Sequence, residues 1–98
     1  MEYQINIIDD IRNEFNDNVD VEVEFKNGLK YHATFFTLKN IEEIMNNYKN
    51  TRECLSGKYF WSSQMIIIEK LEPDLIISAI EDLIKSDEFE FVFKEQKE

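Results

Sequence analysis

The sequence predicts an α+β fold in which a single sheet of about five strands, antiparallel or mixed, packs against three helices. Two kinds of pattern lead to this prediction. Residues 19–35 alternate apolar and polar side chains, as a β-hairpin with one buried face does. Residues 5–16, 38–50 and 73–85 repeat apolar side chains at the helical period. The expected order is α-β-β-α-β-β-α-β, with the helices mainly on one face of the sheet.

The hairpin of residues 19–35 has a register that follows from its apolar face. A three-residue loop, 26–28, pairs Phe25 with Leu29 and places the apolar residues of both strands on one face. A two-residue loop would instead pair Lys26 with Leu29 and bring charge onto that face. We therefore expect the three-residue loop.

The same register organises the polar face of the hairpin. It sets Glu24 opposite Lys30 and Glu22 opposite His32, and both are favourable cross-strand pairs. Gly28 falls at the left-handed position of a type I turn with a bulge, where glycine has no steric cost.

The three helical stretches carry different boundary signals. Thr37 is the expected N-cap of the middle helix, with Asn40 as a competing later start. Pro73 suits the first turn of the third helix. The first stretch, 5–16, also alternates at its beginning, so an extended start is the alternative there.

Further strands are expected in the second half of the chain. After a loop over 50–57, the apolar stretches 58–61 and 65–69 predict a second hairpin, joined near Ser62-Ser63. A last strand is expected at 89–93, where phenylalanines alternate with other residues.

The second hairpin is apolar on both faces, and it supplies the candidate binding site. In one interpretation both strands are central, and the first helix covers the second face. In the other, Phe60, Met65 and Ile67 stay exposed as a patch rimmed by charged residues that include Glu22 and Glu24. Methionine and aromatic residues are enriched at binding surfaces. The second interpretation therefore predicts a protein-binding or self-association surface.

Few residues are suited to catalysis or metal binding. His32 is the only histidine and Cys54 the only cysteine, and the hairpin register makes His32 an ordinary partner of Glu22. A Cys54–His32 dyad is the weaker, enzymatic alternative, since no third orienting group accompanies it. One cysteine and one histidine do not make a structural zinc site, and two glycines offer no phosphate-binding loop. We expect no catalytic residues, no metal and no cofactor.

The formal net charge of −10, from 21 acidic and 11 basic residues, limits the classes of partner. Nucleic-acid-binding surfaces need clustered lysine and arginine, and anionic membranes attract basic segments. We therefore expect no direct nucleic-acid binding and no membrane binding. The charge either serves solubility alone or forms an acidic face for a basic protein surface, such as the nucleic-acid-binding site of another protein.

Length and termini suggest a small intracellular protein. The 98 residues have the length of one domain, 1–98, with a frayed polar tail at 94–98. The N-terminus lacks the pattern of a signal peptide, and no apolar run approaches the ~20 residues that span a bilayer. A lone cysteine makes no internal disulfide. We expect a cytoplasmic protein, and the abundance of isoleucine, asparagine, lysine and glutamate suggests a bacterial, AT-rich genome.

Small acidic α+β proteins of this general kind include bacterial toxin-immunity proteins and phage-encoded inhibitors, an analogy of fold class and charge alone. The leading hypothesis is a non-enzymatic module that binds a basic protein as an inhibitor or immunity protein. The alternative is a homo-oligomeric structural protein, in which the two-faced hairpin closes a homodimer.

Overall fold

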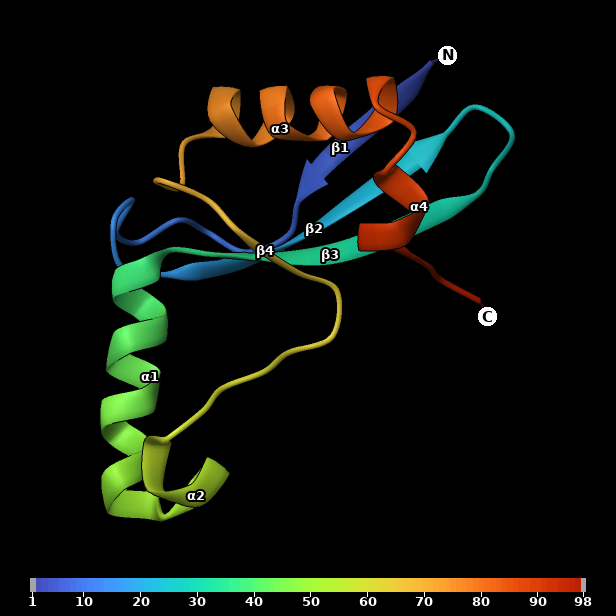
Figure 1. The fold of residues 1–98 in the computed structure, drawn as a ribbon. Helices are drawn as coiled ribbons and strands as arrows, with labels where there is room; N and C mark the ends of the chain where they lie inside the picture. Colours follow the sequence, from blue (N-terminus) through green and yellow to red (C-terminus); the bar gives the residue numbers. More distant parts are fainter. Residues whose placement is uncertain (1, 98) are drawn as a thin grey trace.

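A computed structural model describes residues 2–97 of the protein, which form one sheet with α3 and α4 on one face (Figure 1). In chain order the elements are β1 (Tyr3–Ile7), β2 (Asn18–Phe25), β3 (Lys30–Phe36), α1 (Leu38–Thr51), α2 (Glu53–Gly57), β4 (Met65–Ile67), α3 (Pro73–Lys85), α4 (Phe89–Val92) and β5 (Lys94–Glu95). The predicted α+β class with a single five-stranded sheet is confirmed. The sheet is mixed, because β4 is parallel to β3 whereas the other pairs are antiparallel.

The hairpin of β2 and β3 has the predicted register. Val23 lies opposite Tyr31, and Glu22 opposite His32. The backbone N–H of Phe25 donates to the carbonyl of Leu29 at 2.9 Å, which closes the three-residue loop. Because apolar and charged residues alternate along both strands, only this register places all the apolar side chains on one face.

The core lies between the apolar face of this hairpin, α3 and α4. Its large side chains with almost no exposed surface are Val19, Val21, Val23, Phe35, Leu71, Ile76 and Ile80. Burying each one stabilises the fold by about 1.5–3 kcal/mol. Helix α3 has the predicted bounds, with Pro73 in its first turn.

The predicted first helix over residues 5–16 is not formed, because Tyr3–Ile7 is the strand β1. Its alternating residues Tyr3, Ile5 and Ile7 add to the apolar face beside β2, where Ile5 lies opposite Val23. The extended conformation prevails because the edge of β2 offers backbone hydrogen bonds as well as an apolar face. Residues 8–17 then return as an irregular loop, so no first helix covers the second face of the sheet.

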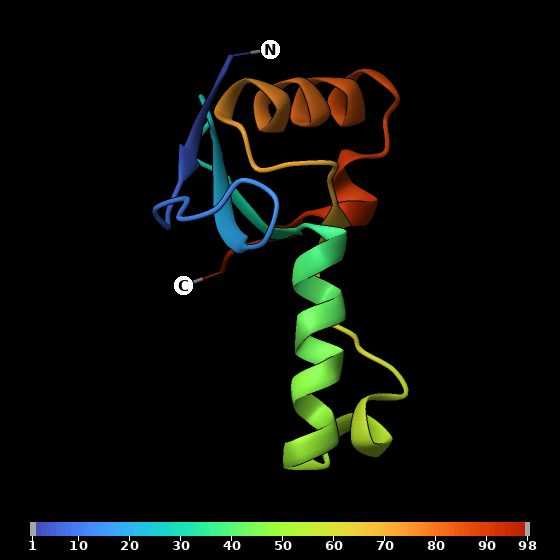
Figure 2. The same ribbon diagram turned by 90° about the vertical axis from the view of Figure 1, so that its left-hand side faces the viewer.

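Helix α1 begins where the sequence predicts, since the Thr37 hydroxyl accepts from the backbone N–H of Asn40 at 3.2 Å. It then leaves the sheet instead of packing on it, and none of its residues is buried. Figures 1 and 2 show it projecting away from the sheet, with α2 at its far end. We call α1, α2 and residues 58–64 the arm.

The predicted hairpin of 58–61 and 65–69 is also wrong. Residues 58–61 form no strand but lead back from the tip of the arm. On the way, the ring of Phe60 packs against Phe36 and Tyr48, with centroids 5.4 and 6.4 Å apart. Strand β4 then pairs parallel with β3, because residues 58–64 carry the chain back past the end of β3 to Thr34 before it turns and runs in the same direction.

The predicted strand at 89–93 is a single helical turn, α4. The rings of Phe89 and Phe93 stack at 4.4 Å, which their spacing of four residues permits in a helix. The last strand, β5, comes later and pairs with the start of β3. Lys94 and Glu95 are thus paired in the sheet instead of frayed, and Glu98 lies outside the described residues.

The tip of the arm depends on an unusual turn, found where the sequence predicted a plain loop. Residues 54–56 of α2 have left-handed backbone angles, with φ between 50° and 58°. Gly57 follows with a φ of 83°, and a Cβ there would overlap the carbonyl oxygen of Met45 in α1. Glycine therefore lets α2 fold back directly onto the backbone of α1.

Replacing Gly57 with alanine is expected to detach the tip of the arm without unfolding the sheet. The new methyl group would overlap the Met45 carbonyl, and the left-handed conformation itself costs about 1–2 kcal/mol for alanine. The fluorescence of Trp61 and hydrogen exchange of the α1 amides measure the change. Gly28→Ala is the matched control, with a φ of 91° but no atom within 4 Å of the added Cβ. Equal effects in the two variants on the arm would contradict this packing.

Candidate functional site

One face of the sheet is open, and it holds the residues of the predicted patch. Helices α3 and α4 pack on the opposite face, and α1 leaves the sheet at the end of β3 (Figure 1). Among residues 2–97, no helix lies flat on the open face. Side chains that alternate with the buried ones along β2 and β3 therefore point toward solvent.

The apolar residues of the predicted patch gather at one end of this open face. Met65 and Ile67 lie beside Thr34 and Phe36 in the parallel pair, and Ile67 is 50 % exposed. Phe60 reaches the same place from the arm and covers the ring of Phe36. The structure thus brings Phe60, Met65 and Ile67 together, although not as the two-stranded unit that the sequence suggested.

The acidic residues of the predicted patch lie on the same face, farther along β2. Glu22 and Glu24 alternate with buried valines, and Glu22 accepts a long hydrogen bond of 3.5 Å from the Asn6 amide. Asp20 lies between them and the apolar end, where it accepts from the Thr34 hydroxyl at 2.6 Å. We call Phe60, Met65, Ile67, Glu22 and Glu24 the open-face patch.

Trp61 belongs to the same surface as Phe60, although alternation along the expected strand 58–61 would put these two neighbours on opposite faces. Its side chain is 68 % exposed in the arm next to Phe60. Trp61 also lines a shallow apolar hollow with Phe36, Tyr48 and Phe60. Because residues 58–61 are irregular, a strand-like alternation could not assign their directions.

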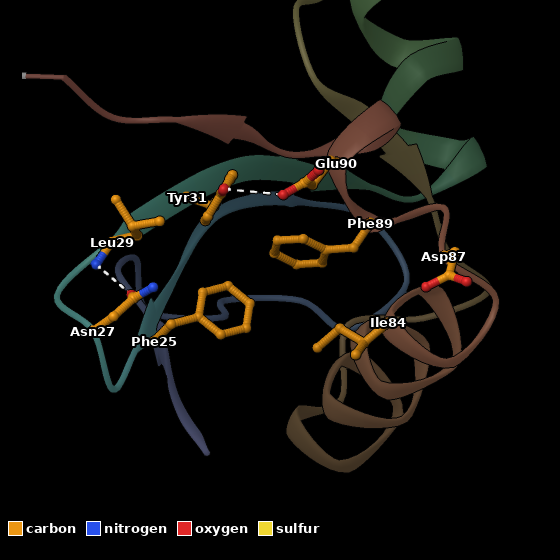
Figure 3. A pocket seen from close by; sticks show the side chains of 8 residues that line it. All are labelled: Phe25, Asn27, Leu29, Tyr31, Ile84, Asp87, Phe89 and Glu90. Atoms are coloured by element: carbon orange, nitrogen blue, oxygen red, sulfur yellow. Dashed lines mark hydrogen bonds between the residues drawn. The ribbon is translucent and has the colours of Figure 1, made fainter. Parts of the chain in front are cut away.

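A second concave site lies at the turn end of the β2–β3 hairpin, against α3 and α4 (Figure 3). We call it the turn pocket; its lining residues are Phe25, Asn27, Leu29, Tyr31, Ile84, Asp87, Phe89 and Glu90. This pocket was not predicted from the sequence, because residues 89–93 were expected to form a strand. The spacing of Phe89 and Phe93 was the only signal that a helical turn brings Phe89 to the hairpin.

The tyrosine of the turn pocket is tied to an acidic residue. The Tyr31 hydroxyl donates to Oε1 of Glu90 at 3.3 Å. Burial raises the pKa of Tyr31, and the negative charge of Glu90 raises it further. The hydroxyl therefore stays protonated and remains a donor at neutral pH.

The residues of the enzymatic alternative are not brought together. His32 lies in β3 opposite Glu22, whereas Cys54 lies in α2 at the far end of the arm (Figures 1 and 2). A helix of 14 residues, about 21 Å long, separates α2 from the sheet. Within residues 2–97, no group of three or more histidine, cysteine, aspartate or glutamate side chains is arranged to hold a metal ion. None of the described helices has the length and apolar character needed to cross a membrane.

Comparison with known proteins finds no matching family model, no matching curated protein and no matching solved structure.

Phe89→Ala is expected to lower the free energy of unfolding by about 3–5 kcal/mol, because the buried ring contacts Phe25, Tyr31 and Phe93. Phe91→Ala makes the same change two residues away, where the ring is 89 % exposed, and is expected to cost less than about 0.5 kcal/mol. Urea unfolding measures both values. Similar losses for the two variants would contradict the helical turn, since a strand would place both rings on one face.

Proposed function

We propose that this protein is a non-enzymatic binding module that engages a basic protein partner through the open-face patch. The observation that carries the proposal is the apolar cluster of half-buried Phe60 and Met65 with exposed Ile67, on a sheet face that no described helix covers. Exposed clusters of this kind, rimmed by polar residues, are typical of protein-binding sites.

The two parts of the patch have different roles in this proposal. The apolar end, extended by Trp61, provides the buried contacts that dominate binding energy, since aromatic anchors are the usual hot spots. The acidic row of Asp20, Glu22 and Glu24 attracts and orients a basic surface. The net charge of −10 extends that attraction over the whole molecule.

An inhibitor or immunity protein is the role that fits this combination best. A basic surface that binds nucleic acid presents the opposite charge, and an acidic protein seated on it blocks access of the nucleic acid. The proposal places the protein in the cytoplasm, because its only cysteine has no partner for an internal disulfide.

Ile67→Lys is expected to reduce capture of the partner at least tenfold while the protein stays folded. Half of this side chain is already exposed, so lysine extends into solvent, but at the interface its charge must be desolvated. The measurement is a quantitative pull-down from a lysate of the native organism at low and high salt. Ile77→Lys is the matched control, because Ile77 is 37 % exposed on α3, away from the patch.

The expected partner is basic and is released by salt, because exposed charge contacts are screened beyond about 10 Å at 0.1 M salt. Equal capture by Ile67→Lys and Ile77→Lys would remove the open-face patch as the binding site. Recovery of only the protein itself at every salt concentration would remove the basic partner.

A second candidate function, a homodimer, is favoured by the free edge of β1. The N–H of Ile8 donates to Asp20, and the N–H of Lys26 donates to Glu2. Antiparallel pairing alternates, so the backbone groups of Tyr3, Ile5 and Ile7 point away from β2. No strand among residues 2–97 pairs with that side of β1, so these groups form an open edge.

This edge lacks the usual protection against pairing with another strand. Strand β1 contains no charged residue and no proline, which are the common protective devices. Two copies of β1 pairing antiparallel about Ile5 would set Gln4 opposite Asn6 of the second copy, and Tyr3 opposite Ile7. The two sheets would then continue into one. This arrangement replaces the homodimer expected from the hairpin of residues 58–69, which the structure does not form.

Q4K/N6K is expected to keep such a dimer apart, because the lysine introduced at position 4 would face the lysine introduced at position 6 of the second copy. Q4E/N6K carries the same change at position 6 but offers an attractive pair, so it is expected to keep the dimer. Sedimentation equilibrium of the unmodified chain and both variants measures the association. A monomeric unmodified chain, or equal association of the two variants, would rule out pairing through β1.

A further inference from the structure

We propose that the turn pocket binds the side chain of one arginine from a basic protein. This site is separate from the open-face patch, because Phe25 and Tyr31 belong to the face of the sheet on which α3 and α4 pack. The inference therefore goes beyond the proposed function, and it stands or falls by its own experiment.

Three aromatic rings form the inner wall of the pocket. The centroids of Phe25, Tyr31 and Phe89 lie 5.2 to 5.6 Å from one another, and each pair of rings meets at a steep angle of 72° to 89°. Figure 3 shows them grouped between the hairpin and α4. Aromatic rings attract cations, and arginine makes such contacts more often than lysine.

The size of the pocket suits one side chain. Its volume is ≈ 380 Å³, near the lower end of the range of about 300–1,000 Å³ for small-molecule sites. Leu29 and Ile84 contribute apolar surface beside the aromatic wall. The aliphatic stem of a long cationic side chain packs well against such surface while its charged head stays near the rim.

The rim of the pocket is acidic. Asp87 and Glu90 are both exposed and both line the pocket, at the positions that Figure 3 labels. The bond from Tyr31 occupies Oε1 of Glu90 and leaves Oε2 as an acceptor. Among the lining residues there is no lysine, arginine or histidine to neutralise the two carboxylates.

These features together favour arginine over other occupants. A guanidinium group is planar, stacks on aromatic rings and presents five N–H donors, so it can meet two carboxylates at once. An ammonium group is a compact point charge and gains less from the aromatic wall. An anionic ligand would meet Asp87 and Glu90, and a purely apolar side chain would leave both carboxylates without a cation.

The test is an NMR titration of the full chain at low salt with the peptide acetyl-Gly-Arg-Gly-amide. Its twin carries citrulline, which keeps the shape of arginine but has no charge. The arginine peptide is expected to shift the methyl signals of Leu29 and Ile84, and the citrulline peptide is expected to leave them in place.

Matched variants separate the pocket from general charge attraction. D87N/E90Q is expected to weaken binding of the arginine peptide by roughly fivefold or more, since it removes both charge contacts. E42Q/E43Q removes the same charge from exposed positions on α1 and is expected to leave binding unchanged. Circular dichroism checks that both variants are folded, which the exposure of all four side chains leads us to expect.

Three results would overturn the proposal. Equal shifts with citrulline would show an apolar occupant, and unchanged binding by D87N/E90Q would show that the carboxylates take no part. Equal weakening by E42Q/E43Q would reduce the effect to net charge. Ile67→Lys lies on the other face and is expected to bind the peptide normally, so failure of the open-face patch and failure of the turn pocket are distinguishable.

Discussion

The rest of the structure depends on the burial of one face of the β2–β3 hairpin. Valines of β2 and Phe35 of β3 lose almost all contact with water under Ile76 and Ile80 of α3. Because side chains alternate across a strand, burying this face forces the charged residues of β2 onto the other face. Strand β1 and helix α4 then complete the buried side, and no helix of the described residues lies on the second side of the sheet.

This division explains why the two candidate sites have different characters. The open-face patch is broad, and its apolar end exists because the arm brings Phe60 back over Phe36. The turn pocket is small and lies at the margin of the core, where Phe89 leaves a hollow against the hairpin. Both carry acidic residues, so both are suited to basic surfaces. The open-face patch can contact a broad surface, whereas the turn pocket is a single small recess.

The sequence predicted those parts of the fold whose periodicity had one interpretation. Residues 19–35 alternate without exception, and their register is confirmed; the Thr37 cap and Pro73 mark two helix starts correctly.

The predictions failed in segments where two periods fit the same residues. Tyr3, Ile5 and Ile7 fit a strand, whereas the overlapping set Ile7, Ile8, Ile11 and Phe15 fits a helix; Phe89 and Phe93 fit a helical turn as well as a strand. Tertiary pairing with β2 and packing against Tyr31 decided these cases, and neither is visible in local pattern. The membership of the patch was therefore predicted better than its shape, and the turn pocket was not predicted at all.

Helices α3 and α4, which cover the apolar face of the sheet, follow the arm in the sequence. This order has a consequence for synthesis on the ribosome. Strands β1 to β3 emerge first, with an apolar face that has no cover until α3 and α4 have been made. Until then, the charged residues of β2 and the polar turns are favourably hydrated, but they lie on only one side of the nascent sheet. A chain stalled in the arm would expose both an apolar face and an unpaired strand edge, which is the kind of species that chaperones bind and that aggregates when they are scarce.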